Sequence, residues 1–220
     1  MSKVAVLLDG GYVRKALRLR GLNGEDPVLV RRVANLCVDP GNIGDSLFRI
    51  YYYDCLPSSK QSRNPVSKNR INFATTQHYL DSMAFIDALK KQDRVAFRAG
   101  HTAFRGWALK PRAFNQVVRG QANLAEDDVK PNIQQKGVDI KIGLDIALLS
   151  ARSVVDKIVL VTRDRDFIPA MKCARREGMA IAVASIETAP LPEHLEHADE
   201  AYIIHPQEQD DAKAMELIGS

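Results

Sequence analysis

The sequence has few cysteines, and their spacing excludes the usual cysteine-based sites. Cys37, Cys55 and Cys173 are an odd number of thiols in 220 residues, and none belongs to a Cys-x-x-Cys pair. A disulfide framework or a zinc ribbon would need paired cysteines at short, regular spacings. We therefore expect a protein of a reducing compartment, with no thiolate metal site.

Long apolar runs and a strong charge imbalance are also lacking. The first apolar run, Val4 to Leu8, is too short for a signal peptide or a membrane span, and nothing later in the chain approaches the length of a membrane span. We expect a cytoplasmic protein with no membrane partner. The 31 Lys and Arg exceed the 27 Asp and Glu by four, which by itself favours a polyanionic partner only weakly.

What the sequence does contain is a set of short apolar runs that end in acids. The run from Ile158 to Val161 is followed by Thr162, Asp164 and Asp166. A continuously apolar run is typical of a parallel strand that is covered on both faces, and open α/β sheets bind ligands at the carboxyl ends of such strands. Two acids at that edge repel each other unless a cation, a proton or bulk water relieves them.

The same pattern recurs along the chain and predicts the fold class. Lys3 to Asp9 is a second such strand, followed by a Gly10-Gly11 turn, and Leu47 to Asp54 is a third. Further strands are expected at 94–98, 180–185 and 201–204, and helices at 12–20, 27–38, 73–92, 136–150 and 167–177. This alternation predicts a single α/β domain over 1–205. We expect a loop at 39–44, a short hairpin or an irregular insertion near 100–135 and a polar C-terminal tail at 206–220.

Two further acids lie in the helix expected after Lys136. Asp139 and Asp145 are six residues apart, about 240° around a regular helix. They can face one site if Asp139 caps the helix. Clustered carboxylates suit Mg²⁺ or Mn²⁺, and such an ion can activate water for attack on a phosphodiester. We expect the strands that end at Asp9 and Asp164 to be neighbours at the centre of the sheet.

Three motifs in this order resemble the NYN domain of the PIN-like nuclease superfamily, in its LabA-like bacterial branch. They are Asp9-Gly-Gly-Tyr12, Lys136-Gly-Val-Asp139 with Asp145, and Thr162-Arg-Asp-Arg-Asp166-Phe. The resemblance implies a Rossmann-like three-layer α/β/α sandwich with a central, mostly parallel sheet. It also implies metal-dependent endoribonuclease cleavage of single-stranded or structured RNA that leaves 5′-phosphates. A homodimer is possible.

The resemblance also assigns roles to individual residues. The residues matched to the catalytic, metal-binding acids are Asp9, Asp139, Asp164 and Asp166, and the matched helix acid that also serves the metal is Asp145.

The chain departs from the family pattern at the third motif. The family has Ser-Gly-Asp-Ser-Asp where this chain has Thr162-Arg163-Asp164-Arg165-Asp166. The two arginines can neutralise the acids and weaken the metal site, or they can reach substrate phosphates. Basic residues flank the acidic motifs and are suited to phosphate contacts; the predicted RNA-binding residues are Arg14, Lys136, Arg163 and Arg165.

Each acid also has a purely structural interpretation. Asp164 and Asp166 can cap the helix that follows them, and Asp9 can belong to the turn before two glycines. Asp145 can pair with Lys141 at i, i+4 spacing. The basic residues near the motifs can form a solvated surface.

Two other functions stay open at this point. The first is a catalytically inactive NYN module that binds RNA or a protein partner. The second is a phosphohydrolase with Asp9 as the nucleophile. Such enzymes usually carry a second acid two residues later, where this chain has Gly11, so this alternative is the weaker one.

Overall fold

The computed structural model describes residues 2–38, 45–120, 123–209 and 213–218. The loop expected at 39–44 and parts of the 100–135 segment and of the C-terminal tail lie outside these residues. The chain divides into two compact units. The α/β unit comprises Met1–Asp54, Phe85–Ala99 and Gly137–Ser220, and the inserted unit comprises Cys55–Ala84 and Gly100–Lys136.

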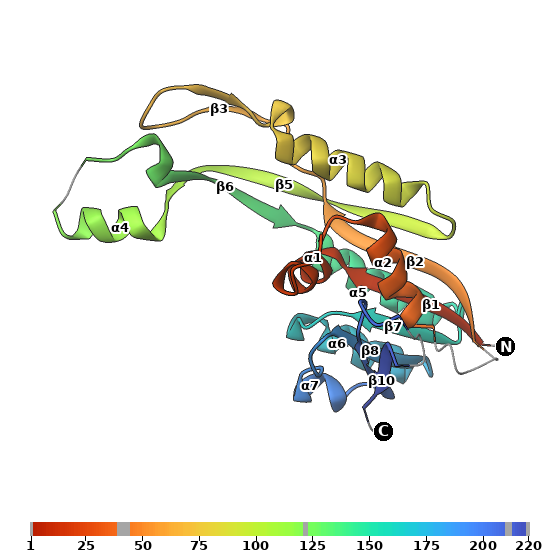
Figure 1. Cartoon of the computed structure of the whole chain (residues 1–220). Helices are drawn as coiled ribbons and strands as arrows, with labels where there is room; N and C mark the ends of the chain where they lie inside the picture. The colour runs from red at the N-terminus through yellow and green to blue at the C-terminus, as the bar shows by residue number, and fades with distance from the viewer. Residues whose placement is uncertain (1, 39–44, 121–122, 210–212, 219–220) are drawn as a thin grey trace. The chain divides into compact units, whose positions relative to one another are not determined.

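A mostly parallel sheet forms the centre of the α/β unit (Figure 1). Its strands are β1 (Ser2–Asp9), β2 (Asp45–Cys55), β5 (Val95–Leu109), β7 (Lys157–Val161), β8 (Ala180–Ile186), β9 (Glu200–Ile204) and β10 (Met215–Leu217). Their hydrogen-bonded order is β10-β9-β8-β7-β1-β2-β5, with β10 antiparallel to β9. The predicted α/β class and mostly parallel sheet are confirmed.

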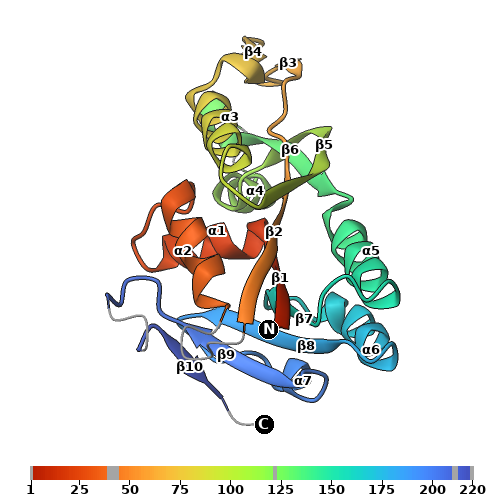
Figure 2. The same ribbon diagram turned by 90° about the vertical axis from the view of Figure 1, so that its right-hand side faces the viewer.

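Helices cover both faces of this sheet. Figure 2 shows α1 (Gly10–Leu19) and α2 (Pro27–Leu36) on one face, with α5 (Val138–Ala151) and α6 (Ile168–Arg176) on the other. A short helix, α7 (Pro192–Leu195), precedes β9, and α3 (Gln77–Lys90) runs from the inserted unit into the α/β unit. No helix in the described residues is long and apolar enough to cross a bilayer.

The two strands that carry the acidic motifs lie side by side, as the sequence predicts. β1 pairs with β7 in parallel, with Leu8 opposite Val161. The apolar runs of both strands have no exposed surface, because helices cover them from both sides. Their carboxyl ends, and therefore Asp9 and Thr162, fall at the same edge of the sheet.

The start of α5 differs from the prediction that Asp139 caps it. The N-cap residue is Gly137, in a left-handed conformation with φ +78°, and Asp139 lies in the first helical turn. This conformation is unfavourable for residues that have a side chain, which is why glycine occupies the position. Because glycine has no side chain, α5 begins without a side-chain cap. The predicted cap was wrong.

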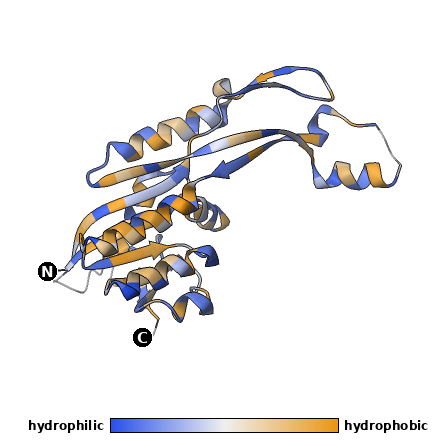
Figure 3. Ribbon diagram, turned by 180° about the vertical axis from the view of Figure 1, so that it is seen from behind, coloured by the Kyte–Doolittle hydropathy of each residue, from blue (hydrophilic) through white to orange (hydrophobic). Residues whose placement is uncertain are grey.

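α5 is apolar around most of its circumference, as its colouring in Figure 3 shows. It buries Ile142 and Ile146, while Ile140, Leu144 and Leu148 are exposed at i, i+4 and i+8 positions. A helix that is hydrophobic all round is usually buried. In this chain one of its faces stays uncovered.

Besides the first part of α3 and the continuation of β5, the inserted unit contains strands, a helix and two short turns of 3-10 helix. They are β3 (Gln61–Arg63), β4 (Arg70–Asn72), η1 (Phe73–Thr75), α4 (Pro111–Val118), η2 (Glu126–Asp128) and β6 (Val129–Lys136). β3 and β4 form an antiparallel hairpin, and β6 pairs antiparallel with the continuation of β5. The segment near 100–135, expected to be a short hairpin or an irregular insertion, is an antiparallel pair of strands with a helix between them where it is described.

Candidate active site

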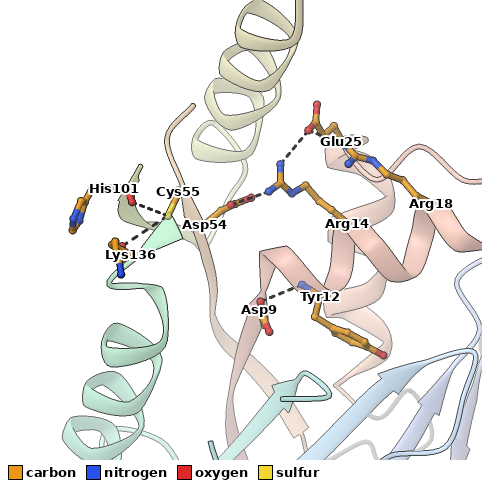
Figure 4. Close-up of polar contacts among 9 residues, drawn as sticks. All are labelled: Asp9, Tyr12, Arg14, Arg18, Glu25, Asp54, Cys55, His101 and Lys136. Atoms are coloured by element: carbon orange, nitrogen blue, oxygen red, sulfur yellow. Dashed lines mark hydrogen bonds and ion pairs between the residues drawn. The ribbon is translucent and has the colours of Figure 1, made fainter. Parts of the chain in front are cut away.

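Asp9 ends β1 and caps α1, so its side chain is fixed at the carboxyl edge of the sheet. The Tyr12 N–H donates to one carboxylate oxygen at 3.2 Å (Figure 4), and the Thr162 hydroxyl donates to the other at 3.0 Å. Burial raises the pKa of Asp9 above its ordinary value. The two hydrogen bonds oppose this rise, and the charges of Asp139 and Asp164 add to it.

Asp164 is held by a second set of short-range contacts. Its carboxylate accepts the N–H of Asp166 at 2.9 Å, and its own N–H donates to the Thr162 hydroxyl at 3.1 Å. Its carbonyl oxygen lies 2.9 Å from Nε2 of His194, which is fully buried. Asp9 caps α1, and Asp164 caps the 3-10 turn Arg165–Phe167, whereas the N-cap of α6 is Phe167. The two caps hold both acids at one edge of the sheet.

The sequence indicates the hydroxyl of Thr162 but not its two hydrogen bonds. From the sequence, His194 and His197 are expected to be surface residues, which is wrong for His194 because its side chain is fully buried. Thr162 is fully buried and joins the two acids by donating to Asp9 and accepting from Asp164. The register of β1 and β7, which only the structure gives, is what places these groups together. The sequence signal for Thr162 was its position directly after a buried strand.

Asp139 joins this group electrostatically. It is exposed in the first turn of α5. Partial burial raises the pKa of Asp139, and the charges of Asp164 and Asp166 raise it further. Four of the predicted acids, from three separate segments, therefore interact through their charges. Repulsion of this kind is relieved by a proton or by a cation.

The chemistry of these donors fits a hard divalent cation. All four side chains offer carboxylate oxygens, the ligands that Mg²⁺ and Mn²⁺ prefer. Within the described ranges, however, no three His, Cys, Asp or Glu side chains are already grouped closely enough to hold an ion. The acids match the ion in type and charge, and small side-chain movements would have to complete its coordination.

Three of the four acids, Asp9, Asp164 and Asp166, line a cleft of about 620 Å³. Its lining residues are Asp9, Gly11, Tyr12, Lys15, Arg163, Asp164, Arg165, Asp166 and Leu191. A second hollow of about 440 Å³ shares Tyr12, Lys15, Arg163 and Leu191 with it and has a more apolar lining. Carboxylates and cations thus border one open cleft, an arrangement that suits a phosphodiester beside a metal ion.

The two arginines of the third motif contact other partners than the acids. Arg163 donates to the hydroxyl of Thr188 at 3.0 Å, and Arg165 forms an ion pair with Glu193 at 3.0 Å. In the part of the chain that the structure describes, neither forms an ion pair with Asp164 or Asp166. The geometry gives no support to the interpretation that they neutralise the acids.

Asp145 lies apart from the four acids. It accepts two hydrogen bonds from Arg98, at 2.8 and 2.7 Å, and a third from the Tyr53 hydroxyl at 2.8 Å. Lys141, its expected i, i+4 partner, instead donates to the carbonyl oxygen of Ala99. The Lys141 pairing was wrong, and Asp145 has a structural partner of its own.

The predicted RNA-binding residues also differ in their surroundings. Arg14 is largely buried, and its guanidinium bridges Asp54 at 3.0 Å and Glu25 at 3.1 Å (Figure 4). The ion pair with Asp54 holds α1 against β2. Lys136 is exposed at the end of β6, in the inserted unit.

Comparisons with known proteins identify one matching family. The family model described as the NYN domain matches residues 3–206. No curated protein matches the sequence. The chain resembles the crystal structure of a protein of unknown function from Vibrio parahaemolyticus, at 18% identity and a TM-score of 0.45, over 99% of this chain and 96% of that one.

Proposed function

The chain belongs to the NYN domain family, and from this premise we propose that it is a metal-dependent endoribonuclease that hydrolyses RNA phosphodiester bonds. One observation carries the proposal. Four acids from three segments interact through their charges, and this interaction raises the pKa of two of them. The four are Asp9, Asp139, Asp164 and Asp166, and the pKa is raised at Asp9 and Asp139. Such an arrangement destabilises the unliganded protein, which favours a function that uses the charge.

The proposed mechanism assigns a task to each group. Asp9, Asp164 and Asp166 would hold Mg²⁺ or Mn²⁺, with Asp139 bound directly or through water. When bound, the ion supplies a Lewis acid that lowers the pKa of water and stabilises charge on the phosphodiester. Asp139, which is exposed in the first turn of α5, would accept a proton from the attacking water.

The cations of the cleft are assigned to substrate binding. Lys15 and Arg163 line both the acid cleft and the adjoining hollow, so an RNA backbone that follows these hollows passes both side chains. Charged contacts of this kind dominate nucleic-acid affinity.

The test is a cleavage assay on single-stranded and structured RNA in Mg²⁺, Mn²⁺ or EDTA. We expect Asp9→Asn and Asp164→Asn to lose roughly 100-fold or more of the activity, because a lost ligand removes the ion. Asp93→Asn makes the same chemical change at a highly exposed acid and should leave activity unchanged. Wild-type rates for both site variants, with intact circular dichroism, would refute the assignment.

A non-catalytic NYN module that binds RNA or a protein is the second candidate, favoured by the finding that no three ligating side chains of the described residues are already grouped closely enough to hold an ion. It predicts RNA binding that EDTA does not affect and no cleavage in Mn²⁺. The same assay, with a binding measurement beside it, separates the two functions.

A further inference from the structure

The inserted unit carries the positive charge of the chain. It contains ten Lys and Arg against four Asp and Glu, a net charge of +6, although the whole chain carries only +4. The α/β unit is therefore slightly acidic. All ten cations are exposed. Surface charge of one sign, concentrated on one unit, is typical of a surface that binds a polyanion.

These cations also lack the ion pairs that several cations in the α/β unit form. Arg14, Arg98 and Lys157 are among those in that unit that form ion pairs. Over the described residues of the inserted unit, no cation is in an ion pair. Its acids accept hydrogen bonds from uncharged groups instead, as Glu126 does from Asn69 at 3.1 Å.

The β3–β4 hairpin concentrates this charge. Arg63 and Arg70 are directly opposite each other in its register, and Lys60 and Lys68 are exposed beside them. No acid occurs between residues 55 and 80. Like charges at directly opposite strand positions destabilise a hairpin, and a bound anion between them would remove that cost.

The hairpin is nevertheless held in place. The indole N–H of Trp107 donates to the Ser62 hydroxyl at 3.1 Å, and Trp107 packs with Phe73 and Phe104 in a small aromatic cluster. The side chain of Asn64 donates to the Glu126 carbonyl oxygen at 3.3 Å. The aromatic residues are thus used inside the unit, and the arginines remain on its surface beside a hollow of about 300 Å³.

We propose that the β3–β4 hairpin is a phosphate clamp, in which the opposed Arg63 and Arg70 bind the backbone of RNA without regard to base sequence. This assignment of the hairpin rests on the proposed function only because it takes RNA as the polyanion. Arginine is suited to this task because its planar guanidinium binds phosphate oxygens in pairs. The clamp is a binding site outside the acid cleft, on residues that take no part in the cleavage.

The test measures binding of a labelled 30-nucleotide single-stranded RNA to the full chain in EDTA, over a range of salt concentrations. We expect Arg63→Gln/Arg70→Gln to weaken binding about tenfold at low salt and to reduce the slope of log K against log salt by about 1.4, for two lost phosphate contacts. The control is Lys91→Gln/Lys172→Gln, which removes the same charge from exposed positions of the α/β unit. It should change affinity less than twofold.

Equal affinity and slope for the two double variants would overturn the clamp. A second readout needs no RNA: because the opposed charges repel, Arg63→Gln/Arg70→Gln should melt at or above the wild-type temperature. A lower melting temperature would overturn the premise of repulsion. Binding is measured without metal, so loss of the clamp and failure of the nuclease activity are seen separately.

Discussion

One hydroxyl group organises the candidate site at the scale of single residues. Thr162 donates to Asp9 and accepts from the N–H of Asp164, so it sets the orientation of both acids. Groups that orient metal ligands typically change metal affinity or activity by about 10- to 100-fold when they are lost. Thr162 is thus assigned a positioning role, distinct from that of the acids that would touch the ion.

Replacement of this hydroxyl gives a direct test. Thr162→Val keeps the shape of the side chain, leaves Asp9 without one donor and leaves the N–H of Asp164 without an acceptor. We expect cleavage in limiting Mg²⁺ to fall about 10- to 100-fold, with partial recovery at high Mg²⁺, and stability to fall by about 1–3 kcal/mol. Thr162→Ser restores the hydroxyl and should retain activity. Equal activity of the Val and Ser variants would contradict the positioning role.

Asp139 and Asp145 provide a matched pair of substitutions on one helix. The raised pKa of Asp139 means that its charged form is disfavoured in the folded state. This cost is present above its folded pKa and disappears below the unfolded value of 3.8. Asp139→Asn should therefore raise the melting temperature in EDTA at pH 7, and the gain should vanish toward pH 3.8.

Asp145→Asn should act in the opposite direction. It weakens the bonds from Arg98 and Tyr53 to a buried carboxylate, so we expect a loss of about 1–3 kcal/mol at pH 7. Differential scanning calorimetry of both variants measures the contrast. If Asp145→Asn instead stabilised the protein in EDTA and shifted the Mg²⁺ dependence of cleavage, Asp145 would be a metal-site residue, as the family resemblance implies.

At the scale of elements, the turn between β1 and α1 sets the position of Asp9. Gly10 lies so close to β2 that an added Cβ would be 2.5 Å from the Tyr53 carbonyl oxygen and 2.8 Å from the Tyr52 ring. Gly143, in the middle of α5, would place its Cβ at an ordinary 4.0 Å from Ala170. The two glycines have different uses: one allows close packing, and the other only weakens a helix.

Replacing each glycine by alanine should therefore have opposite effects. Gly10→Ala should destabilise the protein by about 1–3 kcal/mol and lower the activity, since it displaces α1 and the cap at Asp9. Gly143→Ala should stabilise it by about 0.5–1 kcal/mol, because alanine is the better helix former. Urea unfolding and a cleavage assay test both. A stable, active Gly10→Ala variant would show that α1 adjusts without moving Asp9.

The sequence predicted those elements whose patterns are local. The apolar runs before Asp9 and Asp164 indicated parallel strands that are buried on both faces. Such strands were expected at the centre of the sheet, and the two are neighbours there. The cap at Gly137 was missed because a left-handed residue depends on how β6 enters α5. Pairings between distant segments, such as Arg98 with Asp145, leave no periodic signal in the sequence.

For the same reason, the inserted unit was the least predictable part. β5 continues to Leu109, far beyond the expected 94–98, because its second half is stabilised by pairing with β6. Its core of Phe73, Phe104 and Trp107 joins positions that are more than 30 residues apart. The basic composition of residues 60–70 was visible in the sequence, but the opposition of Arg63 and Arg70 needed the strand register.

On the scale of the whole molecule, the two units divide the charge between them. The acids with raised pKa values, Asp9 and Asp139, lie in the α/β unit, whereas the inserted unit carries +6. The proposed chemistry needs negative charge to hold a cation, and substrate affinity needs positive charge to hold a polyanion. Placing these charges on separate units lets each be concentrated without neutralising the other.

This division predicts how the kinetics depend on RNA length. Contacts made equally in the ground state and the transition state change KM and leave kcat unchanged. Arg63→Gln/Arg70→Gln should therefore raise KM for a 30-nucleotide RNA about tenfold, in line with the lost phosphate contacts, at nearly constant kcat. For an RNA too short to occupy the clamp and the cleft together, wild type and variant should have the same kcat/KM. Steady-state cleavage in Mn²⁺ measures both substrates. A fall in kcat that is equal for long and short RNA would mean that the hairpin acts on the catalytic step, and the division of roles would be wrong.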